Sequence, residues 1–235
     1  MIIRNLVLSG GGPSGFLTYG ASRYLNKIGF WELANIKSIY GTSIGAFLGV
    51  VFSMNLDWKY LDNYIINNNW EEVLDLKPRS FIDAYSSKGI VNEHFIKDAM
   101  YPLFEEINLD HNINLQDFYN YNNIDLHLYT TEMNGYKFEK IDLSYKTHPK
   151  LKVIEAVEMS TAFPIIFRPI LKNKKCYIDG GLINNLPLND CIKQTKSKKN
   201  ELLVFKNSWT NNKIHINKKS SIIDFILVFI LKLVE

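Results

Sequence analysis

The sequence predicts an α/β domain in which buried strands alternate with helices. Residues 2–8 are short, apolar and β-branched, as in a buried parallel strand. After a glycine-rich loop, residues 16–25 have apolar side chains at helical spacing. Residues 36–40 and 44–54 repeat this order of strand and helix. At 235 residues the chain is long enough for one such domain with a full core, or for two small ones.

Weaker patterns fill most of the remaining length. Asn134-Gly135 lies between two strand-like runs and favours a tight hairpin. Residues 71–91 and 107–123 are irregular, so we expect loops there, with an active-site flap as the alternative for 71–91. Other helices are expected at 57–69, 92–105 (with Asn92 as the N-cap) and 152–159, and other strands at 126–131, 137–141, 167–171, 175–178 and 202–205.

The C-terminal region differs in composition from the rest. Residues 222–234 form an apolar run that is shorter than the ~20 residues needed to span a bilayer, and a buried terminal helix is expected. The pattern is unfinished at Glu235, as in a fragment of a longer protein. We expect 1–210 to be the folded domain, and 211–235 to be a linker and helix that pack on it or continue into a further region.

A serine stands between the second strand and its helix. The pattern Gly41-x-Ser43-x-Gly45 is that of a nucleophile elbow, in which a strained turn exposes the hydroxyl group. Glycine on both sides has a steric reason, because strand and helix approach too closely there for Cβ atoms. The N-terminus of the helix also favours negative charge that develops nearby. The pattern is weak alone and depends on two other segments, 9–15 and 177–187.

The loop Ser9-Gly10-Gly11-Gly12-Pro13-Ser14-Gly15 joins the first strand to its helix and directs several N–H groups toward one point. Its glycines fit G-x-G-x-x-G, but no acidic residue ends a second strand about 20 residues later, so a dinucleotide site is weakly supported. A P-loop is excluded because Gly-Lys-Ser/Thr is missing. An oxyanion hole is the third interpretation. Pro13 has no N–H, so Gly11 and Gly12 are the expected donors, with Gly10 in reserve.

An aspartate follows the strand predicted at 175–178. Asp179-Gly180-Gly181 stands where an α/β sheet places catalytic groups, at the carboxyl end of a strand. A simple Asx turn would explain the same three residues.

Together these segments resemble the patatin-like phospholipases, a family of lipid acyl hydrolases. The order and spacing agree from residue 4 to about 205. The matching segments are the glycine loop 10–15, Gly41-Thr42-Ser43-Ile44-Gly45, the block 159–164, Asp179-Gly180-Gly181 and Asn185-x-Pro187.

The resemblance implies a three-layer α/β/α domain with a mostly parallel sheet and a Ser-Asp dyad without histidine. It makes Ser43 the nucleophile, Asp179 its base and Gly10, Gly11 and Gly12 the oxyanion hole, with a phospholipid or other acyl ester as substrate. The family usually has Arg or Lys where Ser14 stands, so charge assistance from that side chain is not expected, whereas the backbone donors survive.

Other functions fit less well. A Ser-His-Asp triad is disfavoured because no histidine stands in a recognisable late turn after an acid; the histidines are 94, 111, 127, 148 and 215. A non-catalytic lipid-binding or effector module would be expected to lose the serine, the aspartate or the glycines. An acyltransferase could use the same serine. No cofactor is expected, and no ligand spacing supports a metal site.

Charge and cysteine content indicate which partners and which cellular compartment to expect for the protein. The segment 172–219 has eleven lysines and a local charge of +8, against −5 for the rest. It is either a solvated face or a surface drawn to anionic lipid. No nucleic-acid module is recognisable. Two isolated cysteines, Cys176 and Cys191, and the absence of N-x-[ST] sites and of a signal peptide favour a cytoplasmic protein, or one peripheral at intracellular membranes.

Overall fold

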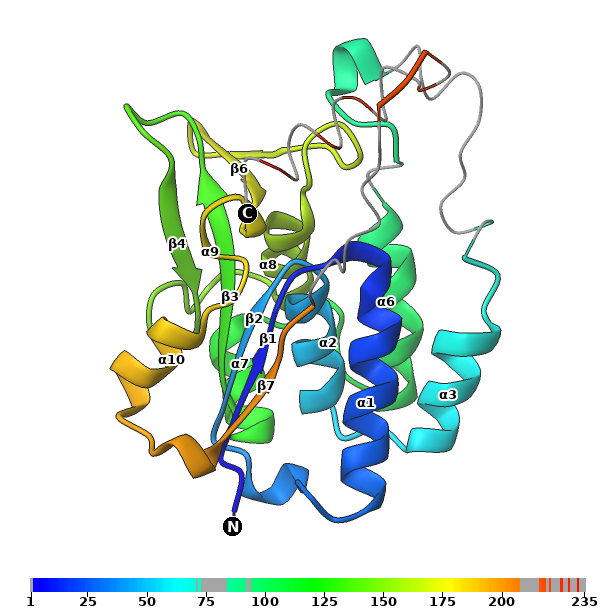
Figure 1. Cartoon of the computed structure of the whole chain (residues 1–235), viewed down its shortest axis with the longest axis vertical. Coiled ribbons are helices and arrows are strands. Elements are labelled where there is room, and N and C mark those ends of the chain that lie inside the picture. Colours follow the sequence, from blue (N-terminus) through cyan, green and yellow to red (C-terminus); the bar gives the residue numbers. More distant parts are fainter. Residues whose placement is uncertain are drawn as a thin grey trace.

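A computed structural model describes residues 2–70, 72, 84–91 and 94–207, together with isolated positions between 216 and 232. Its described part contains a seven-stranded mixed sheet with helices on both faces (Figure 1). The strands are β1 (Asn5–Leu8), β2 (Ser38–Thr42), β3 (Asp125–Glu132), β4 (Glu139–Leu143), β5 (Ile170–Lys172), β6 (Lys175–Asp179) and β7 (Leu202–Phe205). The α-helices are α1 (Gly15–Lys27), α2 (Ile44–Ser53), α3 (Trp58–Asn67), α6 (Phe95–Glu106), α7 (Leu115–Asn122), α8 (Val153–Thr161), α9 (Gly181–Asn184) and α10 (Leu188–Thr195).

The sheet order is β5-β6-β3-β2-β1-β7, with β4 on the other edge of β3. Strands β7, β1, β2 and β3 are parallel, whereas β4 and β6 run antiparallel to β3. On one edge of β3, β2 pairs as far as Tyr129 and β6 pairs from Thr130 onward. Since β2 and β6 run toward each other along that edge, their carboxyl ends meet. This arrangement brings residues 43 and 179 together.

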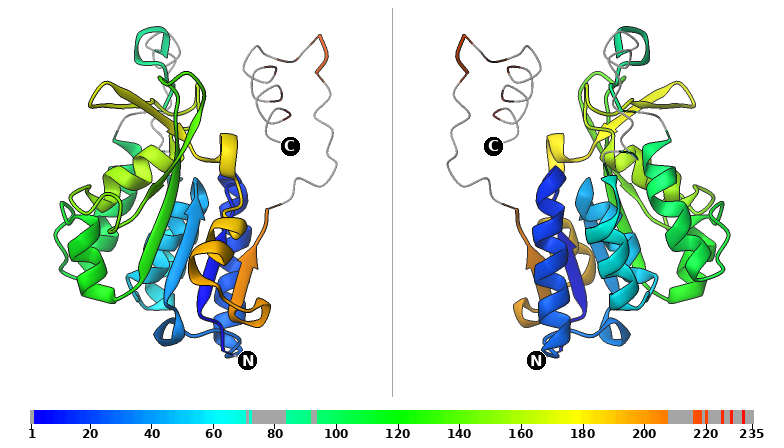
Figure 2. Two further views of the ribbon diagram at one scale, coloured as in Figure 1. Left: turned by 90° about the vertical axis from the view of Figure 1, so that its left-hand side faces the viewer. Right: turned by 90° about the vertical axis from the view of Figure 1, so that its right-hand side faces the viewer.

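The two faces of the sheet are covered unequally. Because side chains alternate along a strand, Leu6 and Leu8 enter the large core beneath α1, α2, α6 and α8, while Val7 points the other way. Val7 packs in a small second cluster with Tyr40, Tyr129 and Cys191 of α10. Figure 2 shows the helices crowded on one side of the sheet and α10 on the other. The predicted α/β architecture with a mostly parallel sheet is confirmed.

Some expectations about single elements were wrong. Residues 107–123 are not all loop, because α7 forms within them: the Asn114 side chain accepts a hydrogen bond from Asp117 N at 2.8 Å and caps the helix. Leu115 and Phe118 are fully buried there. Helix α8 continues to Thr161, and α10 after Pro187 was not expected. Asn92, most of 71–83 and most of the terminal helix at 222–234 lie outside the described residues.

The lysine-rich segment does not form one surface. Lys174 lies between β5 and β6, beside the carboxyl end of β3, because Met133 N donates to Cys176 O at 2.9 Å. Lys199 directly precedes β7, which starts opposite Asn5 at the amino end of β1. The two groups of lysines therefore lie at opposite ends of the sheet. Attraction of the segment 172–219 to anionic lipid therefore stays a prediction.

Candidate active site

Ser43 occupies the turn between β2 and α2 with φ 56° and ψ −125°, a backbone conformation that non-glycine residues rarely adopt. The glycines on either side allow this turn. A Cβ atom on Gly41 would lie 2.4 Å from Gly45 O, and one on Gly45 would lie 2.3 Å from Leu8 O. The steric reason expected for the two glycines is therefore confirmed.

Asp179 is the hydrogen-bond partner of this serine. Ser43 Oγ donates to Asp179 Oδ2 at 2.6 Å, and Gly181 N donates to Asp179 Oδ1 at 2.6 Å. The carboxyl group is buried, with 2% of the residue exposed. Burial raises the pKa of Asp179 to about 6, although the hydrogen bonds from Ser43 and Gly181 act in the opposite direction. A carboxylate with this pKa is ionised at neutral pH and is a stronger base than an exposed aspartate.

Ser160, near the end of α8, hydrogen-bonds to the backbone of the Ser43 turn. Its Oγ accepts a hydrogen bond from Ser43 N at 2.9 Å and donates one to Tyr129 O at 2.6 Å. The side chain is completely buried. The sequence pattern at 159–164 did not indicate this role for Ser160, because the partners of Ser160 are 117 and 31 residues away in the sequence.

The glycine loop passes directly beside Ser43. A Cβ atom on Gly10 would lie 3.2 Å from Ser43 Cβ and 2.3 Å from Asn185 Oδ1. However, Gly10 N already donates to Asn185 O at 3.0 Å. The Gly10 amide is therefore not available to an oxyanion, in contrast to the expectation that it could serve as a spare donor. The amides of Gly11 and Gly12 have no acceptor among the described residues.

The Ser14 side chain forms a hydrogen bond within the glycine loop. Its Oγ donates to Gly11 O at 2.7 Å, and the Ser14 amide donates to the same oxygen at 3.1 Å. A neutral hydroxyl at this position therefore orders the backbone around Gly11 and adds no charge to the site.

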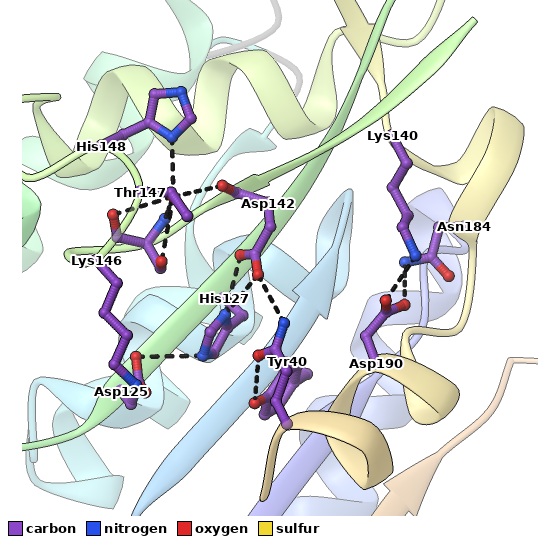
Figure 3. A network of polar contacts seen from close by, with 12 residues as sticks. Tyr40, Asp125, His127, Lys140, Asp142, Lys146, Thr147, His148, Asn184 and Asp190 are labelled. Atoms are coloured by element: carbon purple, nitrogen blue, oxygen red, sulfur yellow. Dashed lines mark hydrogen bonds and ion pairs between the residues drawn. The ribbon is translucent and has the colours of Figure 1, made fainter.

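None of the histidines within the described residues is the hydrogen-bond partner of Ser43 Oγ. His127 is buried on the sheet face under α10, where its ring stacks on Tyr40 with centroids 4.3 Å apart (Figure 3). Both of its nitrogens face carboxylates: Nδ1 lies 2.8 Å from Asp142 Oδ2, and Nε2 lies 3.2 Å from Asp125 Oδ1. His148 bonds to its neighbour Thr147 and His111 packs on Tyr101. His215 lies outside the described residues.

The His127 cluster also includes side chains from α10 and from the segment that follows β4. Gln194 of α10 accepts from Tyr40 Oη at 2.8 Å and donates to Asp142 at 3.1 Å, and Lys146 pairs with Asp125. Burial alone would lower the pKa of His127, but hydrogen bonds and the charges of Asp125 and Asp142 raise it to about 9. The imidazole is thus a cation at neutral pH, and its ring nitrogens are engaged by carboxylates.

Among the described residues, no group of three or more His, Cys, Asp or Glu side chains is arranged to hold a metal ion. The same part of the chain contains no helix of sufficient length and apolarity to cross a bilayer. Cys176 and Cys191 are both buried free thiols.

Comparison with known proteins decides the family. The model of the patatin-like phospholipase family matches residues 6–192. The chain belongs to this family. A probable lipid hydrolase of Invertebrate iridescent virus 6 is 24% identical over 83% of the chain, and an uncharacterized protein of Acanthamoeba polyphaga mimivirus is 26% identical over 79%. The chain spans 65% and 60% of the length of these two relatives, which is less than two thirds.

The crystal structure of VipD from Legionella pneumophila has the same fold. It superimposes with a TM-score of 0.56 and 18% identity, over 87% of this chain and 49% of VipD. At this identity the similarity supports the patatin-like fold alone. The extent of the domain, 1–210, and the separate character of 211–235 stay predictions.

Proposed function

We propose that the protein hydrolyses carboxylic esters of membrane lipids, in the manner of a phospholipase A, through an acyl-serine intermediate. Ser43 is the nucleophile and Asp179 is its general base. The observation that carries this proposal is the 2.6 Å hydrogen bond from Ser43 Oγ to a buried carboxylate, at a strained turn beside a glycine loop.

In the first half-reaction, Ser43 Oγ attacks the ester carbonyl carbon while its proton passes to Asp179 Oδ2. The oxygen that becomes negative is stabilised by the amides of Gly11 and Gly12, and each such donor contributes about 3 kcal/mol. Asp179 then returns the proton to the leaving alcohol, and the acyl group stays on Ser43. In the second half-reaction, Asp179 takes a proton from the water that attacks the acyl-serine, and it returns this proton to Ser43 Oγ as the fatty acid leaves.

The weak basicity of a carboxylate favours esters over amides, because an alcohol leaves with less help from a proton than an amine does. Membership of the family, and a relative named as a probable lipid hydrolase, support a lipid as the source of the ester. The protein would then work at a membrane surface.

A fluorophosphonate probe tests this function. We expect the wild-type protein to be labelled on Ser43 and to hydrolyse p-nitrophenyl and phospholipid esters, with Ser43→Ala giving the background in both assays. Mass spectrometry of the labelled peptide identifies the residue. A folded wild-type protein that neither reacts nor hydrolyses would instead be a binding module that has kept the fold.

The pH dependence of the reaction should report the titration of Asp179. Its pKa of about 6 means that the base is ionised above pH 6 and protonated below it, so kcat/KM is expected to fall about tenfold per pH unit on the acid side. Initial rates with a soluble ester between pH 4.5 and 8 measure this. An acid limb centred near pH 4 would show that burial does not shift the base.

A further inference from the structure

Two hairpins are fastened together at the carboxyl end of β3. One is the β3–β4 turn, 133–138, and the other is the β5–β6 turn at Asn173 and Lys174. Asn134 Nδ2 donates to Lys174 O at 3.1 Å, so the turns touch. The Glu132 carboxylate accepts from Asn134 N at 2.8 Å and from Gly135 N at 3.2 Å, which fixes the first turn from within. Figure 1 shows the tip of the first hairpin projecting at the upper left, near β6.

These turns expose large apolar side chains that the fold does not require at the surface. Tyr136 is fully exposed, Leu171 is 65% exposed, Phe138 53% and Met133 41%. Single exposed apolar residues are ordinary, but four on two joined turns form a patch, and such patches mark interaction sites.

Lysines surround this patch. Lys140 and Lys172 are engaged by Asp190 and Glu155, whereas Lys137, Lys174 and Lys175 are exposed and have no ion-pair partner among the described residues. Glu139 is exposed beside them and the Glu132 carboxylate is buried in the first turn, so the three lysines face two acids and the net charge stays positive. We call this set the hairpin surface; it consists of Met133, Tyr136, Phe138, Leu171, Lys137, Lys174 and Lys175.

The hairpin surface lies at the same end of the sheet as Ser43. Ser43 directly follows Thr42, which ends β2 and pairs with Tyr129 of the parallel strand β3, and the first turn begins four residues after Tyr129. Phe16 (50% exposed) and Leu17 (73%) begin α1 at this end too, beyond the glycine loop. Apolar side chains therefore flank the candidate active site on two sides.

We propose that the hairpin surface docks the protein on a bilayer that contains anionic phospholipid. Tyr136, Phe138 and Leu171 enter the headgroup region, and the three lysines bind lipid phosphates. Charge complementarity selects this partner, because aromatic side chains interleaved with lysines match an interface that is apolar below and negative above. The inference rests on the proposed function, since it states where the lipid substrate is met.

Of the lysines in the segment 172–219, only Lys174 and Lys175 belong to the hairpin surface, so only a part of that segment is proposed to bind lipid. Lys193, Lys196 and Lys199 lie on or after α10 and before β7, toward the amino end of the parallel strands. They face away from a membrane that contacts the hairpins. These three exposed lysines therefore serve as a matched control for Lys137, Lys174 and Lys175.

Vesicle sedimentation tests the docking surface, in a Ser43→Ala background that leaves the lipid intact. Vesicles of phosphatidylcholine with 30 mol% phosphatidylglycerol are the probe. The variant Lys137→Gln/Lys174→Gln/Lys175→Gln is expected to lose about 100-fold in partition coefficient, and the control Lys193→Gln/Lys196→Gln/Lys199→Gln less than about threefold. Equal losses in both variants, or no binding by the parent protein, would overturn the proposal.

The apolar contribution is tested separately. In the same Ser43→Ala background, Tyr136→Ser/Phe138→Ser/Leu171→Ser should bind these vesicles at least tenfold more weakly, also at 0.5 M salt, where charge is screened. With Ser43 restored, the triple variant should hydrolyse a soluble p-nitrophenyl ester within twofold of wild type. Undiminished vesicle binding by this variant would contradict insertion. Failure of the wild type on the soluble ester would instead count against the proposed hydrolase, independently of docking.

Discussion

The variant Asp179→Asn is expected to lose about 10³- to 10⁴-fold in kcat for ester hydrolysis while it remains folded, because the amide is nearly isosteric with the carboxylate but cannot accept the serine proton. An asparagine can keep the bond from Gly181 N through its oxygen, and its amide nitrogen then donates to Ser43 Oγ in place of the 2.6 Å bond that Asp179 accepts. Initial rates with a soluble ester measure the loss. Asp190→Asn is the matched control, since Asp190 is also an acid paired near α9 and α10 but does not contact Ser43, and it should retain activity.

The same substitution is expected to stabilise the protein. Ionisation of Asp179 in its buried site is unfavourable, so its pKa is raised to about 6. A carboxyl group with a raised pKa contributes stability below its ordinary value near 4, and this contribution is lost as the pH rises through 6. At pH 8 Asp179→Asn should therefore be more stable than wild type by about 2 kcal/mol, measured by urea denaturation. A variant that keeps more than a tenth of the activity, or that unfolds more readily at pH 8, would argue against Asp179 as a buried base.

The variant His127→Gln is expected to lower the free energy of unfolding by about 3 kcal/mol at pH 7, which is the usual cost of breaking a buried ion pair by removing one partner. The imidazolium lies between the carboxylates of Asp125 and Asp142, 3.2 and 2.8 Å away (Figure 3). Without it, both carboxylates are left partly buried near each other. Urea denaturation of wild type and variant at pH 7 measures the difference.

The effect should depend on pH in a defined direction. The pKa of His127 is raised to about 9, so the cluster stabilises the fold fully below the ordinary value of 6.5 and loses this contribution as the pH rises through 9. The difference between wild type and variant should shrink accordingly at pH 9.5. His148→Gln serves as the control with a change below about 0.5 kcal/mol, since His148 hydrogen-bonds only locally to Thr147. A constant difference from pH 6 to 9.5 would mean that His127 is neutral in the folded protein.

Local patterns were sufficient for the parts of the fold that repeat along the chain. The strands at 2–8 and 36–40 and the helices after them were predictable because burial and period appear within ten residues. The pair Gly41 and Gly45 was predictable from sterics. The proximity of Ser43 and Asp179 was expected only through the family resemblance, since it depends on β6 pairing with β3 directly beyond β2.

Features that depend on distant pairing could not be read from the sequence. Helix α7 was missed because its sequence is rich in asparagine, and only two of its side chains, Leu115 and Phe118, are fully buried. The Gly10 amide was counted as free because its partner, Asn185, is far along the chain. The division of the lysines between the two ends of the sheet follows from the direction of β7, which composition does not show.

The hydrogen bond from Ser43 N to Ser160 has a consequence for inhibitors. In many serine hydrolases, main-chain nitrogens at the nucleophile turn help to hold the oxygen of a covalent adduct. Here the serine's own nitrogen is occupied by a buried hydroxyl, which is itself bound to Tyr129. On the mechanism proposed, a boronate or trifluoromethyl ketone bound to Ser43 would depend on the glycine loop for that oxygen rather than on the nitrogen of Ser43 itself. The potency of such compounds would then report how well the loop is ordered.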